Sequence, residues 1–127
     1  MKTILAASLL LIANVSQADV IKCMFTEPFV DSVYSMTQST LTYTGLGIEK
    51  TVVKNVSFQI KGAGSFELVA KDGTVLQVLT LNNDGSDGMS DVVYPFQVKD
   101  NNEIVAANAG HGGCTSNSLK SFEPKLD

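Results

Sequence analysis

The side chains best suited to chemistry lie together in the stretch NNDGSDGMSDVVYPF, which spans residues 82–96. Three carboxylates, Asp84, Asp87 and Asp91, fall within eight residues and repel one another unless they are solvated or bound to a cation. An EF-hand calcium loop also needs a Gly at its sixth position and a Glu at its twelfth, and neither register at the start of the stretch provides both. A calcium site of another type is an alternative interpretation. The simpler expectation is a Gly-rich loop, without metal or cofactor, whose Asp and Ser side chains bond its own backbone.

The same loop is the best candidate for a binding surface, because recognition concentrates on loops held by a rigid scaffold. We expect Asp84, Asp87, Met89 and Asp91 to form it. Gly88 can adopt a positive φ, the carboxylates of Asp87 and Asp91 can cap exposed amides, and Met89 can plug one end of a barrel.

Catalytic patterns are weaker. The GSDG segment lacks the G-x-S-x-G spacing of a nucleophile elbow, which in any case belongs to an α/β sheet. The single histidine, His111, lies in the Gly-rich segment NAGHGGCTSN, which is expected to be a flexible tail. Ser116 or Ser118 beside it would have no preorganised geometry for nucleophilic catalysis. We therefore expect no catalytic residues and no enzymatic activity.

The elements that must position the loop are expected to be strands. Segments rich in Val, Thr and aromatic residues, with Gly, Asn and Asp between them, predict about eight short strands in a small antiparallel barrel or sandwich. One long strand is expected from Glu49 to Ile60, with a bulge near Lys54-Asn55. Asp72-Gly73 predicts a two-residue hairpin, and 103–107 a further strand. Pro95, inside an apolar strand, predicts an edge position or a bulge.

Six aromatic residues are expected to fill the core or pair across it rather than line a ligand cavity. They are Tyr34, Tyr43, Phe58, Phe66, Tyr94 and Phe96.

Residues 1–18 are expected to be a secretory signal peptide. Lys2 precedes an apolar run that is too short to span a bilayer, and Ser16 and Ala18 are small residues at positions −3 and −1 of a cleavage site. Residues 19–127 are then one domain, located in the periplasm or secreted. The mature chain is not expected to insert into a membrane.

Two cysteines, Cys23 and Cys114, remain in this exported chain. A disulfide between them is expected in an oxidising compartment, because no CxxC spacing suggests a metal site or a redox-active thiol.

Charge restricts the partners. Without Lys2 the chain has eight lysines, no arginine and thirteen acidic residues, so that the net charge is −5. This surface is a poor partner for nucleic acid or for an anionic membrane, whereas a cationic periplasmic or secreted protein is permitted.

The segments TEPF (residues 26–29), LTYTG (41–45) and SDGMSDVVYPF (86–96), with a final GGC at Cys114, resemble a family of small exported bacterial proteins and lipoproteins. That family carries TEPFW and C-SDGMSD-x-x-YPF segments. Here Val30 and Gly85 replace the expected Trp and Cys. The resemblance implies that Cys23 takes over the pairing with Cys114, and it implies an exported small domain without assigning an activity.

Two functions follow as hypotheses. The first is a non-enzymatic binding or interaction protein of the cell envelope that uses the loop. The second is an inhibitor of a cell-wall lytic enzyme such as lysozyme, which suits a small, acidic, disulfide-closed barrel facing a cationic target. The Ser-Gly-x-x-Tyr loop of the exported inhibitors of animal-type lysozymes is not found in the sequence.

Overall fold

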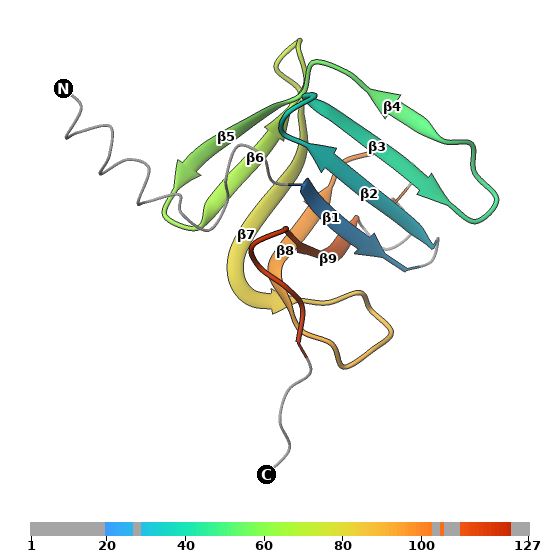
Figure 1. The fold of residues 1–127 in the computed structure, drawn as a ribbon, viewed down its shortest axis with the longest axis vertical. Helices are drawn as coiled ribbons and strands as arrows, with labels where there is room; N and C mark the ends of the chain where they lie inside the picture. The colour runs from blue at the N-terminus through green and yellow to red at the C-terminus, as the bar shows by residue number, and fades with distance from the viewer. Residues whose placement is uncertain (1–19, 27–28, 103–104, 106–109, 123–127) are drawn as a thin grey trace.

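The computed structural model describes residues 20–26, 29–102, 105 and 110–122, and the expected signal peptide lies outside them. The described chain forms a single antiparallel sheet that curls into a half-barrel (Figure 1). Its nine strands are β1 (Val20–Phe25), β2 (Val30–Ser35), β3 (Thr40–Gly45), β4 (Thr51–Val53), β5 (Ser57–Gly62), β6 (Ser65–Val69), β7 (Val75–Gly85), β8 (Tyr94–Asp100) and β9 (His111–Thr115). The all-β class is thus confirmed.

The strand order is β4-β3-β2-β1-β9-β8-β7-β6-β5. Two runs of consecutive strands, β1 to β4 and β5 to β9, therefore meet where β1 pairs with β9 (Figure 1). This junction has only three residue pairs, Lys22 with Thr115, Cys23 with Cys114 and Met24 with Gly113. The disulfide between Cys23 and Cys114 crosses it, which confirms the predicted bridge.

Alternating burial along the strands places the core on the concave face. In β1 and β2 every second residue is buried, and the residues between them are half-buried or exposed. Apolar and aromatic side chains from both halves of the sheet fill the space, with Tyr43, Phe96, Ile21, Leu41, Leu68 and Leu79 fully buried. Phe66 contacts both Phe58, with ring centroids 5.2 Å apart, and Phe96, at 6.1 Å. Five of the six predicted aromatic residues thus belong to the core or pack against it, whereas Tyr94 lies outside the core cluster and lines a groove at the surface of the sheet.

The prediction of a flexible tail around His111 was wrong. Residues 111–115 form β9, a central strand paired with both β1 and β8. Its glycines permit close packing: a Cβ at Gly112 would lie 2.4 Å from the carbonyl oxygen of Met24, and a Cβ at Gly113 would lie 2.7 Å from the ring of Tyr94. Glycine is required here because neighbouring strands and an aromatic ring occupy the space of a side chain.

The expected long strand around Lys54-Asn55 is divided in two. Asn55 has a φ of 60°, which breaks the strand and redirects the chain, so that β4 and β5 form opposite edges of the sheet. Val56 between them is buried; its amide donates to the Ser39 carbonyl at 2.8 Å, and its own carbonyl accepts from the Tyr34 hydroxyl at 2.8 Å. The short connection is therefore fixed onto the β2–β3 hairpin.

The Asp72-Gly73 connection is a hairpin turn, but not the predicted two-residue type. The Gly73 amide donates to the Ala70 carbonyl at 2.9 Å, and Gly73 has a positive φ whereas Asp72 does not. A type I′ turn needs positive φ at both central residues, so this is a type I turn followed by a Gly bulge. Asp72 Oδ1 accepts the Thr74 amide at 2.9 Å and completes the turn.

Pro95 was predicted to lie either on an edge strand or at a bulge. It lies at a bulge, and its strand β8 is not an edge strand. The β7–β8 register shifts between Leu81 and Gly85, and Pro95 has no partner in either neighbouring register. The missing amide of proline therefore costs no ladder hydrogen bond.

Of the predicted strand at 103–107, the structure describes Val105, which is buried in a turn and not in a strand. The other residues of that segment lie outside the described chain.

Candidate functional site: a rigid loop beside an apolar groove

The loop between β7 and β8 is organised by the carboxylate of Asp87. Oδ1 accepts the amides of Met89 at 2.9 Å and Ser90 at 2.8 Å, and Oδ2 accepts the hydroxyls of Ser90 at 2.8 Å and Tyr94 at 3.1 Å. Burial alone would raise the pKa of Asp87, but these hydrogen bonds outweigh burial and lower the pKa to about 2. The carboxylate is therefore ionised at neutral pH and holds the turn Asp87–Ser90 in one conformation.

Two further contacts fix this loop to the sheet. The hydroxyl of Thr26, the residue directly after β1, donates to the backbone carbonyl of Asp87. Tyr94, the first residue of β8, is buried and donates to the Asp87 carboxylate. Burial, the hydrogen bond to Asp87 and the charges of Asp87 and Asp31 raise the pKa of Tyr94 to about 12, so that its hydroxyl keeps its proton. The loop is thus tied to both strands that flank β9.

The structure separates the four predicted binding residues. Asp87 and Met89 lie together at the surface groove described below. Asp84 belongs to the end of β7, and Asp91 is exposed in the loop; neither lines that groove. Met89 does not plug the barrel, because 68% of its side chain is exposed. Within the described chain, no three carboxylate, His or Cys side chains lie close enough together to hold a metal ion.

Apolar side chains are concentrated around a groove of about 320 Å³ next to this loop. Of the seven large hydrophobic residues that are exposed in the described chain, four line it: Met24 (37% exposed), Phe29 (50%), Leu46 (83%) and Met89 (68%). They come from β1, from the turns before β2 and after β3, and from the loop, and Figure 1 shows these segments at one side of the sheet, away from β5. An exposed apolar patch that gathers in one place indicates an interaction site.

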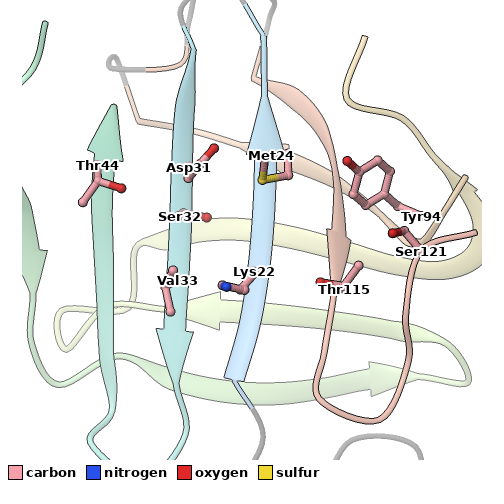
Figure 2. A pocket seen from close by; sticks show the side chains of 9 residues that line it. All are labelled: Lys22, Met24, Asp31, Ser32, Val33, Thr44, Tyr94, Thr115 and Ser121. Atoms are coloured by element: carbon pink, nitrogen blue, oxygen red, sulfur yellow. The ribbon is translucent and has the colours of Figure 1, made fainter. Parts of the chain in front are cut away.

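A second groove of about 510 Å³ continues from the first across the outer face of the sheet. Met24 and Asp31 line both grooves and are direct cross-strand partners on β1 and β2. Figure 2 shows these two side chains between Thr44 on β3 and Tyr94 on β8, with Lys22 farther along β1. Burial raises the pKa of Asp31, and the positive charge of Lys22 partly opposes this effect.

Four residues of the site, Met24, Phe29, Asp31 and Leu46, were not predicted. Leu46 had a signal in the sequence, since it stands between Gly45 and Gly47 in a turn, from where a leucine does not easily reach the core. Met24 and Asp31 occupy outward positions of strands in which every second residue is buried. Their proximity depends on the pairing of β1 with β2, which periodicity alone does not show.

A buried polar cluster inside the half-barrel has a structural role. Asp100 Oδ2 accepts the Tyr43 hydroxyl and the Gln77 side-chain amide, both at 2.7 Å, and its Oδ1 accepts the Asn102 amide at 2.6 Å. Gln77 also donates to the Ser32 hydroxyl at 2.8 Å. Burial raises the pKa of Asp100 although all three donors oppose it, and burial beside the Asp100 carboxyl raises the pKa of Tyr43. The cluster links β2, β3, β7 and β8 across the core.

The residues considered as candidates for catalysis lie on β9 and in the turn that follows it. His111 is exposed on β9, with Lys99 as its partner on β8. The Ser116 hydroxyl accepts the Leu119 amide at 3.1 Å and so caps the turn after β9.

No helix in the described chain is long and apolar enough to cross a membrane. Comparisons of the chain with protein-family models, with curated proteins and with solved structures found no match.

Proposed function

We propose that this protein is exported to the periplasm or secreted and acts there as a non-enzymatic binding protein of the cell envelope. The observation that carries the proposal is the gathering of four exposed apolar side chains around one groove next to a loop that is already ordered. An ordered surface loses little conformational entropy when a partner binds. The disulfide agrees with an oxidising compartment.

Retention of a partner from a cell-envelope extract tests this function. Immobilised protein is compared with its Leu46→Ser and Met89→Ser variants, and Ile60→Ser is the matched control, because Ile60 is 49% exposed on β5 and does not line the groove. We expect each groove variant to retain at least about fivefold less partner, as for a central interface residue, and the control to retain as much as the wild type. Equal retention by all four proteins would place the binding surface elsewhere.

Inhibition of a cationic lytic enzyme such as lysozyme is a narrower form of the same function. It is favoured by the two carboxylates, Asp31 and Asp87, that line the apolar groove. Asp87 is committed to the loop, so the informative substitution is Asp31→Asn. We expect inhibition to be weak, to fall with added salt and to fall further in this variant. Tight inhibition that is affected neither by added salt nor by Asp31→Asn would exclude this groove as the inhibitory surface.

A further inference from the structure

The chemistry of the two adjoining grooves indicates what kind of partner they accept, and this inference rests on the proposed function. The first groove combines apolar side chains with the carboxylates of Asp31 and Asp87, and no lysine is among the described residues that line it. Asp31 stands at the point where the two grooves join, next to Met24. A ligand that lies along both grooves therefore passes a negative charge with apolar surface beside it.

The two carboxylates differ in their capacity to accept further hydrogen bonds. Both oxygens of Asp87 already accept two hydrogen bonds each within the loop, so this residue contributes charge but little free acceptor capacity. Asp31 is half-buried on the outer face of β2, and its described electrostatic partner is Lys22 in the second groove. A cation supplied by a partner would find its acceptor at Asp31.

We infer that these grooves bind an extended segment of a cationic protein, in which a Lys or Arg side chain reaches the carboxylate of Asp31 and a neighbouring apolar side chain packs among Phe29, Leu46 and Met89.

Charge complementarity favours this occupant over the others. A second copy of the chain that docked through the same surface would bring Asp31 and Asp87 of both copies together, and like charges at an interface are unfavourable. An anionic lipid surface and a nucleic acid are repelled by the same carboxylates and by the net charge of −5 that remains when residues 1–18 are excluded. A cationic segment with apolar residues matches both the charge and the apolar rim.

The test titrates the oxidised, 15N-labelled protein with synthetic peptides and follows its amide resonances. The first peptide alternates Lys with Leu and Phe, the second has Glu in place of Lys, and the third has Ser in place of Leu and Phe. The amides of Met24, Asp31, Leu46 and Met89 should shift with the first peptide, and its affinity should exceed that of either control peptide at least about fivefold.

Three variants locate the charge contact. Asp31→Asn, which keeps the shape of the side chain, should weaken binding of the Lys peptide about fivefold, the upper range for an exposed ion pair. Lys22→Gln should strengthen it by removing the competing cation, and Asp72→Asn, on the distant β6–β7 turn, should leave it unchanged. Raising the ionic strength from about 0.01 to 0.15 M shortens the Debye length from ~30 to ~8 Å and should weaken binding further.

The inference is overturned if the Lys peptide shifts no groove amide at low ionic strength, if the Glu peptide binds as well, or if Asp31→Asn binds like the wild type. Retention of an envelope partner that still depends on Leu46 and Met89 would then show that the proposed function stands and only the partner's chemistry is wrong. If retention of the partner also no longer depended on Leu46 and Met89, the proposed function itself would be contradicted.

Discussion

A single carboxylate organises the candidate site. Asp87 accepts four hydrogen bonds within eight residues of chain, and three come from the turn that it closes. The sequence predicted that Asp87 caps amides, since Asp followed by Gly favours such a turn. It gave Asp91 the same role and did not distinguish the two residues, because the difference lies in the hydroxyls of Ser90 and Tyr94, which donate to Asp87.

Replacing Asp87 should therefore loosen the loop. Asp87→Asn keeps the shape but loses the charge and one acceptor oxygen, and we expect the free energy of unfolding to fall by about 1 kcal/mol. Asp91→Asn, an exposed control, should change it by less than about 0.5 kcal/mol. Urea denaturation at neutral pH measures both values. Equal effects of the two substitutions would show that Asp87 does not hold the loop.

The low pKa of Asp87 gives this contribution a defined pH window. Its pKa falls from 3.8 to about 2 on folding, so the native state favours the ionised form. The stabilisation is complete above pH 3.8 and is lost as pH falls toward 2. We expect the stability difference between wild type and Asp87→Asn to shrink over this interval in urea melts. A stability difference that does not change with pH would contradict this assignment. Asp31 and Asp100, whose pKa values are raised, are present in both proteins, so their contributions cancel in the difference.

The interior cluster permits a matched pair of substitutions. Tyr43→Phe removes a hydrogen bond to the buried carboxyl of Asp100, and Tyr34→Phe removes one to the neutral carbonyl of Val56. Hydrogen bonds to charged groups contribute about 1.5–3 kcal/mol, and neutral ones about 0.5–1.5 kcal/mol. Tyr43→Phe should therefore lower the free energy of unfolding more than Tyr34→Phe, as measured by urea denaturation. The reverse order would show that Asp100 is not the stronger acceptor.

At the scale of elements, the class and most strands could be predicted, and the errors at β9 and at the β4–β5 break share one cause. The Gly-rich segment 110–113 suggested a tail because glycine is rare in strands. Its glycines are required by the Met24 carbonyl and the Tyr94 ring, which are distant in sequence. The split between β4 and β5 depends likewise on contacts of Val56 with the β2–β3 hairpin. Local patterns do not contain such long-range contacts.

Gly113→Ala tests this explanation of β9. Its Cβ would lie 2.7 Å from the Tyr94 ring and 2.9 Å from the Ser86 amide nitrogen, so the loop would have to move. Overpacking of this kind costs about 1–3 kcal/mol. Gly62→Ala is the control, since no atom lies within 4 Å of its added Cβ, and it should be neutral or slightly stabilising. Thermal melts of both variants measure these effects. A Gly113→Ala variant as stable as the wild type would refute the packing argument.

The whole molecule depends on the junction between two consecutive halves of the chain. Three residue pairs and one disulfide connect β1 with β9, and the bonded cysteines are 91 residues apart. The disulfide was predictable from cysteine number and expected compartment, whereas its place at this junction was not. The groove was unpredictable for a related reason, since it assembles residues from three connections only once the sheet has formed.

Opening the disulfide should destabilise the whole sheet. For a loop of this length the chain-entropy model gives about 4–5 kcal/mol, which the double variant Cys23→Ala/Cys114→Ala would lose. Urea denaturation of the variant, compared with the oxidised protein, measures the loss. A change below about 1 kcal/mol would show that the three backbone pairs hold the junction alone.

Site-specific photocrosslinking in cells that express the protein tests the central claim, that the apolar groove is the binding surface, most directly. A photoreactive amino acid replaces Leu46, the most exposed apolar residue of the groove, in one protein, and Ile60 on β5 in another. We predict that irradiation joins a discrete partner to the protein labelled at position 46 and leaves the protein labelled at position 60 without one. A discrete adduct from position 60 with none from position 46 would contradict the claim.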